Sequence, residues 1–224
     1  MENAWIIDEG AIIKIGKALI KRDATTLYIK DLYGDGVFTL DPDSFVEIIP
    51  IPPIYRLARI TNTLYLKILT PIVGLGGKSY WLTLPYEVAL VVNGTTIAIL
   101  SPFKVKYTLF GSIVEGMICR YHETTVLGSE GISADYALTL AVTPLSIYAN
   151  MYSYALINMQ SVKLYRSKNE LRIYYEMIRL PSNTSKPYAE PLGKAPKEGL
   201  EEVKVPGDVE SLSEGVPHEY YGPD

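Results

Sequence analysis

Three side chains in the middle of the sequence have types and positions suited to catalysis or ligand binding. Glu87 lies in the apolar segment 86–92, and Arg120 lies in the similarly apolar segment 117–121. His122 comes directly after this second segment. A carboxylate within an apolar strand needs a partner, and we expect Arg120 to supply it. A buried structural Glu87–Arg120 pair is the favoured interpretation. The alternative is a small-molecule or carbohydrate-processing site that uses Glu87 with Arg120 or His122.

Other catalytic and metal-binding patterns fail on spacing. Cys119 and His122 are three residues apart, which places them on opposite faces of a strand and disfavours a Cys–His pair. Segment 77–79 (Gly-Lys-Ser) matches the end of a phosphate-binding P-loop, but Ile72 stands where the first glycine belongs and a strand pattern follows. It is therefore interpreted as a glycine-rich loop between strands. With two His and one Cys in the chain, no Cys/His zinc site is expected, and no metal or other cofactor is predicted.

The composition narrows the class of protein. The chain has 21 basic and 25 acidic residues in 224, so it is not a basic nucleic-acid binder. Its N-terminus lacks a basic and then apolar secretory signal, and its single Cys gives no sign of an oxidising compartment, so a cytoplasmic location is expected. One Gln and one Cys beside 23 Ile and 18 Tyr are typical of a thermophile.

The elements that would position these residues are strands. Segment 11–20 is rich in β-branched residues, segment 103–109 alternates between apolar and polar residues, and Asn93-Gly94 between apolar runs predicts a tight hairpin. Three prolines in segment 45–53 indicate an edge or crossing strand. Segment 171–179 fits either a strand or a helix, and its paired tyrosines favour a strand. The prediction is an all-β, mainly antiparallel sandwich or barrel of about 12–14 strands, possibly two stacked sandwiches.

The longest stretch without charge is 136–162, which spans 27 positions. It is long enough to cross a bilayer, but it carries eight polar residues of the Ser, Thr, Asn and Gln types and one Pro. Buried strands explain the missing charge better, so no membrane span is predicted.

The composition changes after residue 180. Residues 181–224 contain seven Pro, five Gly, nine acidic residues and four Lys, whereas residues 1–180 carry a net charge of +1. We expect one all-β domain over 1–180 and an extended or disordered acidic tail over 181–224. A few apolar positions in the tail could dock on the body or on a partner; they are Leu200, Val203, Val205, Val209 and Leu212.

Segments 84–88 (Leu-Pro-Tyr-Glu-Val) and 102–121 resemble an archaeal family catalogued as a domain of unknown function, number 432. The resemblance covers most of residues 30–180 and implies an archaeal source, but no activity. It draws attention to Arg120 and to a further set of positions as targets for mutation: Lys106, Tyr107, Gly111 and Tyr121. Among these, Lys106, Tyr107 and Tyr121 are the candidate ligand-binding residues.

The functional interpretation is therefore broad. A non-enzymatic β-protein that binds a protein partner is favoured, because no catalytic constellation is evident and the tail is acidic and proline-rich. The β-enzyme built on Glu87 is one alternative. A lectin-like module that uses surface tyrosines and tryptophans to bind carbohydrate is the other. The sequence leaves the oligomeric state open.

Overall fold

Antiparallel β-strands make up most of the molecule. The computed structural model describes residues 5–56, 60–74, 76–130, 136–145, 150–181 and 187–213. Within these ranges the chain forms eighteen strands and one short helix, so the all-β, mainly antiparallel prediction is confirmed. The strand number exceeds the expected 12–14 because several strands near the C-terminus have two or three residues.

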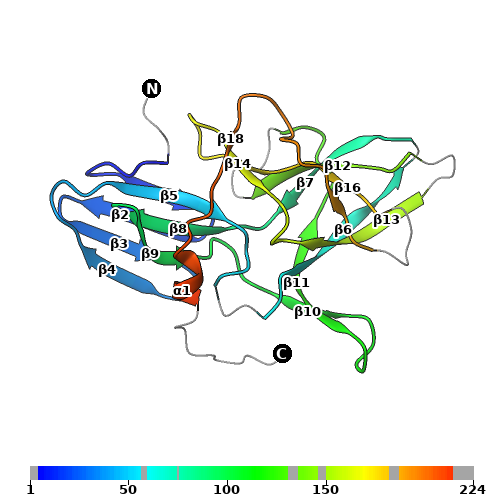
Figure 1. Cartoon of the computed structure of the whole chain (residues 1–224), viewed down its shortest axis with the longest axis horizontal. Coiled ribbons are helices and arrows are strands. Elements are labelled where there is room, and N and C mark those ends of the chain that lie inside the picture. The colour runs from blue at the N-terminus through cyan, green and yellow to red at the C-terminus, as the bar shows by residue number, and fades with distance from the viewer. Residues whose placement is uncertain are drawn as a thin grey trace.

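The strands form four sheets, which remain open in the described part of the chain, so the closed-barrel alternative is wrong. The first sheet is a meander of β1 (Ile12–Ile15), β2 (Ala18–Asp23), β3 (Thr26–Lys30) and β4 (Asp35–Thr39). The second has the order β5 (Val46–Ile51), β8 (Glu87–Val92) and β9 (Thr95–Leu100). Figure 1 shows these two sheets together at one end of the molecule.

The other two sheets lie at the opposite end (Figure 1). The third has the order β10 (Tyr107–Phe110), β11 (Met117–Thr124), β6 (Thr63–Gly74) and β13 (Asn150–Asn158). The fourth is centred on β12 (Ala137–Val142), which pairs with β7 (Ser79–Leu84) on one edge and with β15 (Ile173–Tyr175) and β16 (Ile178–Arg179) on the other. It is completed by β14 (Leu164–Arg166), β17 (Glu190–Pro191) and β18 (Glu201–Glu202).

Several local predictions hold in detail. Asn93, with φ of 49°, and Gly94 form the two-residue turn between β8 and β9. β5 pairs with β8 and is an edge strand of the second sheet, as its prolines indicate. Segment 171–179 forms β15 and β16, so the strand interpretation is correct. The glycine-rich segment after β6 leads into strand β7 and not into a helix, which confirms the rejection of a P-loop.

Two segments differ from their predicted form. Segment 11–20 is not one strand, because Gly16 and Lys17 turn the chain between β1 and β2. Segment 103–109 becomes a strand only at Tyr107, and residues 101–106 cross between sheets as a loop. The exposure pattern also shifts there: Lys104 and Lys106 are exposed, but so are Tyr107 and Leu109. Where a loop crosses from one sheet to another, the positions of inward- and outward-facing side chains need not follow the alternation of the preceding residues. The residue types alone do not reveal this change.

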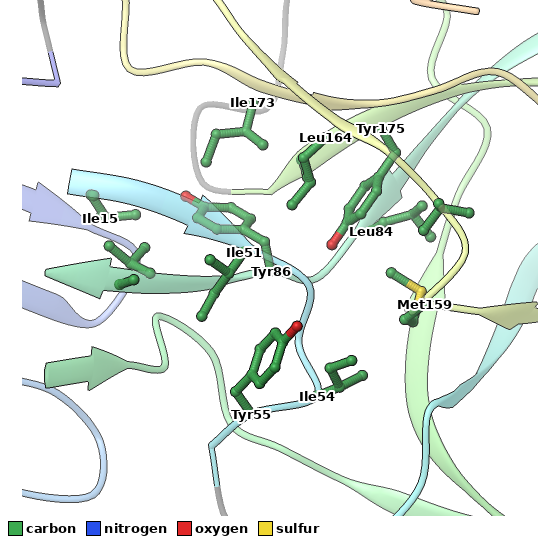
Figure 2. Close-up of a cluster of buried hydrophobic side chains, with 14 of the residues drawn as sticks. Ile15, Ile51, Ile54, Tyr55, Leu84, Tyr86, Met159, Leu164, Ile173 and Tyr175 are labelled. Atoms are coloured by element: carbon green, nitrogen blue, oxygen red, sulfur yellow. The ribbon is translucent and has the colours of Figure 1, made fainter. Parts of the chain in front are cut away.

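One hydrophobic core joins both ends of the molecule. Ile15 and Ile51 from the first two sheets belong to the same buried cluster as Leu84, Leu164 and Tyr175 from the fourth. Figure 2 shows these side chains converging, with the Tyr175 ring pointing toward the chain near Tyr86. The Tyr175 hydroxyl donates a hydrogen bond to the Pro85 carbonyl at 2.8 Å, so this buried polar group is satisfied.

The uncharged stretch 136–162 supplies β12 and β13, which are paired with β7 and β6. Residues 146–149, between them, lie outside the described ranges. No helix in the described chain has the length and apolar character needed to cross a membrane.

The first part of the C-terminal segment packs on the body. Its strands β17 and β18 pair with β16 and β14, and helix α1 (Val209–Ser213) lies beside β9 (Figure 1). Val209 is fully buried, Val203 and Leu212 pack against the core, and the Asp208 carboxylate accepts hydrogen bonds from the backbone N–H and hydroxyl of Thr96. Docking on the body, which the sequence left open, is what the structure shows for residues 187–213.

Candidate functional site

A cleft of about 620 Å³ opens between the first and third sheets. Its rim is formed by the β1–β2 turn, by the 101–106 loop and by the middle of β11. Four lysines line it: Lys14, Lys17, Lys104 and Lys106. We call it the lysine cleft, and its size falls in the range of small-ligand sites.

Backbone contacts hold the rim in place. The Lys17 N–H donates to the Pro102 carbonyl at 2.9 Å, and a side chain at position 16 would meet that same carbonyl, which explains the glycine there. The Ser101 N–H donates to the Asp31 carboxylate at 2.9 Å, and the Tyr121 N–H donates to the Lys106 carbonyl at 2.8 Å. The 101–106 loop is thus fixed at both ends.

The floor of the cleft contains the predicted Glu87–Arg120 pair. The Glu87 side chain is 2% exposed and that of Arg120 is 4% exposed, and an Arg120 nitrogen lies 3.0 Å from a Glu87 oxygen. The second Glu87 oxygen accepts hydrogen bonds at 2.9 Å from the backbone N–H groups of Tyr55 and Arg56. Burial raises the pKa of Glu87, while Arg120 and the two backbone N–H groups act against that rise. Both carboxylate oxygens are occupied, so Glu87 serves to hold Arg120 and the chain at 55–56 in place.

Two buried polar atoms at this floor lack a hydrogen-bond partner among the described residues. Arg120 uses one terminal nitrogen on Glu87 and the other on the Arg56 carbonyl at 2.7 Å, but its Nε has none. The Ser101 hydroxyl has none either, although the residue is 1% exposed. Both residues line the lysine cleft. Both atoms have almost no solvent-accessible surface, and the Nε atoms of Arg22 and Arg56 and the Tyr152 hydroxyl, outside the cleft, are in the same state, so the unpaired atoms do not by themselves mark a ligand site.

One wall of the cleft is aromatic. The rings of Phe103 and Tyr136 stack with centroids 4.1 Å apart, Tyr86 meets Phe103 edge-on at 5.5 Å, and the His122 ring lies 5.0 Å from Tyr136. Phe103, Tyr136 and His122 are only partly buried. The wall therefore presents aromatic surface to the cleft.

His122 is uncharged at neutral pH. Burial is the main cause that lowers its pKa from 6.5 to about 4, and the charge of Lys106 acts in the same direction. Its Nε2 lies 3.3 Å from the Thr83 hydroxyl, which in turn lies 3.0 Å from the Thr124 hydroxyl. The imidazole is thus a neutral hydrogen-bonding group at the cleft.

The lysines supply charge without internal neutralisation. All four are exposed, and in the ranges that the structure describes none of them forms an ion pair. Among the described residues, the acidic side chains in the lining are Glu87, paired with Arg120, and Glu123, which accepts from the Tyr121 hydroxyl at 2.6 Å. A chain with a net charge of −4 therefore concentrates positive charge at this cleft.

The predicted site residues are only partly brought together. Glu87, Arg120, His122, Lys106 and Tyr121 all line the lysine cleft. The Tyr121 ring, however, stacks on Tyr65 at 5.9 Å on the other face of the sheet. Tyr107 does not line the cleft, but its ring lies 5.8 Å from the Arg120 guanidinium. Gly111 turns the β10–β11 hairpin, with φ of 100°.

Sequence reasoning missed much of the lining. Ser101, Phe103, Tyr136 and the lysines of the β1–β2 turn come from segments that had been interpreted only as strands or loops. Lys14 and Lys17 near a glycine were a possible signal of a basic turn, but nothing in the sequence places that turn opposite β11.

Comparison with protein-family models gives one match, described as "Protein of unknown function (DUF432)", over residues 12–216. The chain belongs to this family. The family resemblance found in the sequence is thus confirmed, and the match includes the segment that docks on the body. No curated protein and no solved structure matches the chain. The family has no assigned function, so function is argued from the site itself.

Proposed function

We propose that this member of the family is a non-catalytic binding protein whose lysine cleft takes a small anionic ligand. The observation that carries the proposal is the convergence at one cleft of four exposed lysines that form no ion pair within the described ranges. An anion bound there would neutralise this concentrated positive charge.

The same geometry argues against the enzyme built on Glu87. Its two oxygens are held by Arg120 and by two backbone N–H groups, so no lone oxygen is directed at a substrate. The hydroxyl beside His122 belongs to Thr83, which also lies within hydrogen-bond distance of Thr124. Neither arrangement is that of an activated nucleophile with an oriented base.

The lectin-like alternative has weaker support than the cleft. Tyr65, Tyr121 and Tyr154 lie side by side across the third sheet, with ring planes 7° to 13° apart. Their centroids are 5.4 Å to 5.9 Å apart, so each ring packs against its neighbour. Rings stacked on one another do not form the flat platform that a sugar ring would cover.

The test is calorimetric titration of the full chain with inorganic pyrophosphate, and with citrate as a second anion. We expect saturable binding that weakens as salt is raised. Lys104→Ala and Lys106→Ala should each weaken binding by about two- to fivefold, because each removes one exposed charge contact. Lys168→Ala is the matched control, since this exposed lysine lies outside the cleft and should change nothing. No saturable binding, or an equal loss in the Lys168 variant, would refute the proposal.

A second candidate function is protein recognition by the β10–β11 hairpin, which projects from the molecule (Figure 1). β10 is an edge strand, and Ile113 and Val114 at the tip are 93% and 91% exposed. Leu109 and Ile118 on the paired strands are exposed as well. An extended segment of a partner protein could add a strand to β10 and cover these side chains.

This candidate is tested by quantitative capture from native lysate. A partner lost with an Ile113→Ser/Val114→Ser variant and kept with Leu145→Ser, which alters another exposed apolar residue, would support the hairpin as the binding element. A partner kept by both variants would place the interface elsewhere.

We also propose a cytoplasmic location and a thermophilic archaeal source. The single Cys supports the cytoplasmic location, the family resemblance implies the archaeal source, and one Gln and one Cys beside abundant Ile and Tyr support a thermophile. A thermophilic source predicts a Tm above about 80 °C by calorimetry, well beyond the usual mesophilic range. A Tm within that range would count against it.

A further inference from the structure

We infer that the partner of the β10–β11 hairpin is a second copy of this chain, which adds its own β10 antiparallel to the first around a two-fold axis at Thr108. This inference rests on the hairpin as a protein-recognition element, the second candidate function, and is independent of the lysine cleft. It is supported by the backbone of β10, by the protection of the other edge strands, and by complementary patches at the two ends of the hairpin.

The free edge of β10 presents the backbone groups of Tyr107 and Leu109. In an antiparallel pair, successive residues direct their N–H and C=O groups alternately toward the neighbouring strand and away from it. The Lys106 carbonyl accepts a hydrogen bond from the Tyr121 N–H of β11 at 2.8 Å, so residues 106, 108 and 110 face β11. Tyr107 and Leu109 therefore direct theirs outward, and two copies of β10 can exchange backbone hydrogen bonds between these two residues.

β10 is the least protected edge strand in the described part of the chain. Natural proteins guard edge strands with charges, prolines, bulges or covering segments. The segment Tyr107–Phe110 has neither a charge nor a proline, and it pairs with β11 in an unbroken register. Other sheet edges carry such devices: Lys14 in β1, Asp35 in β4, Pro50 in β5, helix α1 beside β9, and a register shift with a bridge to Tyr188 in β13. An unguarded edge of this kind favours strand addition.

One face of the hairpin is apolar and uncovered. Leu109 lies opposite Ile118, and Tyr107 points to the same face because it is two residues away on the same strand. All three side chains are exposed. With the axis at Thr108, Tyr107 of each copy lies opposite Leu109 of the other. The two apolar faces then form one continuous row, and each copy covers part of the other's exposed surface.

The same register brings the tip of each hairpin to the base of the other. The residues that follow β10 come to lie beside Val105 of the second copy. Val105 donates its N–H to the Tyr33 hydroxyl at 2.7 Å, and Tyr33 and the neighbouring Leu32 are exposed. The exposed tip residues Ile113 and Val114 thus meet an apolar patch. Both halves of this contact lie on one chain, which favours a second copy over an unrelated partner.

The two ends of β10 also carry opposite charges. Lys104 and Lys106 precede the strand and Glu115 lies at the tip; all three are exposed, and none forms an ion pair in the ranges that the structure describes. Antiparallel pairing places the basic base of each hairpin near the acidic tip of the other. A two-fold dimer is therefore complementary in charge as well as in apolar surface.

The first experiment is analytical ultracentrifugation of the full chain from about 1 µM to about 500 µM, a range suited to a small interface. We expect a monomer–dimer equilibrium. Leu109→Lys should raise the Kd of the dimer about a hundredfold, because the two-fold axis brings one added charge from each copy into the interface. Leu69→Lys, the same change at another exposed leucine, is the matched control and should leave the Kd unchanged. Circular dichroism verifies that both variants fold.

The second experiment locates the axis by cross-linking. Cys119 lies opposite Thr108 within the hairpin, so the parent for this test is Cys119→Ala. In that background Thr108→Cys should form a disulfide between two copies when an oxidant is added, because residues on the axis lie directly opposite each other at a separation that a disulfide spans. Ser112→Cys is the control, since this exposed residue lies beyond the end of β10 and away from the axis.

The outcomes separate this inference from hairpin recognition in general. A chain that stays monomeric over the whole concentration range refutes the inference, as does a dimer that Leu109→Lys leaves intact or a Ser112→Cys cross-link as efficient as that of Thr108→Cys. If the chain is monomeric but a captured lysate partner is lost with Ile113→Ser/Val114→Ser, the second copy is wrong and the hairpin remains a recognition element. If neither a dimer nor such a partner is found, both fail.

Discussion

Two buried polar clusters in this molecule, each built around a glutamate, differ in whether they are complete. Glu176 is 2% exposed and accepts hydrogen bonds from the backbone N–H groups of Lys163 and Gly193, while its own carbonyl accepts from Thr139. No side-chain atom of that cluster lacks a partner in the described ranges. Glu87 is equally buried and equally well bonded, but its cluster includes Arg56 and Arg120 and adjoins Ser101, and each of these three has one buried atom without a partner in the described ranges.

The difference separates a structural cluster from a candidate binding site. The Glu176 carboxylate joins three segments, including the segment after β17, and leaves no group for a ligand. The Glu87 cluster joins β8, β11 and the chain at 55–56, and Glu87 and Arg120 line the lysine cleft. Burial of a charged residue by itself therefore says little about function. Its position beside a cleft lined by four exposed lysines says more.

The largest effect should come from breaking the ion pair. Glu87→Ala leaves the Arg120 guanidinium buried without its counter-charge, and we expect a loss of about 3–5 kcal/mol in the free energy of unfolding. Guanidinium chloride unfolding would measure it. The double variant Glu87→Met/Arg120→Met should lose less free energy of unfolding than Glu87→Met and Arg120→Met lose together when measured singly. Glu115→Ala, at an exposed position, is the control and should have little effect. If Glu87→Ala leaves the free energy of unfolding nearly unchanged, the ion pair does not stabilise the fold.

Removing the second carboxylate should cost somewhat less. Glu176→Ala leaves no unpaired charge but frees the N–H groups of Lys163 and Gly193, and we expect about 3 kcal/mol of destabilisation. Because Gly193 lies after β17, the segment from 190 onward should also loosen. Limited trypsin digestion should then cut faster at Lys194 and Lys197. Glu198→Ala, on the same segment and exposed, is the control and should digest like the parent.

The His122 site should make the stability of the protein sensitive to acid. Its folded pKa of about 4 lies below the unfolded value of 6.5, so the unfolded state binds the proton more readily between these two values. Stability should therefore fall as pH is lowered from 6.5 to 4. The loss is about 2 kcal/mol after allowance for partial exposure of the ring.

The comparison with His122→Asn isolates this effect from other groups, including Glu87, whose raised pKa acts in the opposite direction. The variant should lose less stability than the parent across the same pH range in denaturant unfolding experiments. Parallel pH profiles for the two proteins would contradict the assignment.

The smallest effect has the opposite sign. Ser101→Ala removes a buried hydroxyl that has no partner, and the free protein should be unchanged or stabilised by up to about 1 kcal/mol. Thermal unfolding without added ligand would measure this. Thr139→Ala is the matched control near the complete cluster, because its hydroxyl donates to the Glu176 carbonyl at 2.8 Å, and it should be destabilising. If Ser101→Ala and Thr139→Ala lower the free energy of unfolding equally, the Ser101 hydroxyl has an internal partner as the Thr139 hydroxyl does.

Much of the fold could be predicted from residue patterns because they report local preference. The β-branched runs identified the strands, Asn93-Gly94 identified its hairpin, and the paired tyrosines of 171–179 favoured a strand over a helix. The expectation that Glu87 and Arg120 pair also held, because a carboxylate in an apolar strand restricts what its partner can be. These inferences needed no knowledge of which sheets face each other.

The lysine cleft could not be predicted in the same way. Lys17, Ser101 and Arg120 are far apart in the sequence and meet only because the β1–β2 turn packs against the 101–106 loop beside β11. The phase of exposure at Tyr107 was also missed, since the crossing loop resets it. The sequence by itself determined that this is a β-protein with a buried Glu–Arg pair. Only the tertiary structure decided which polar atoms remain unpaired and where the lysines converge, because both depend on contacts between sheets that local preference does not encode.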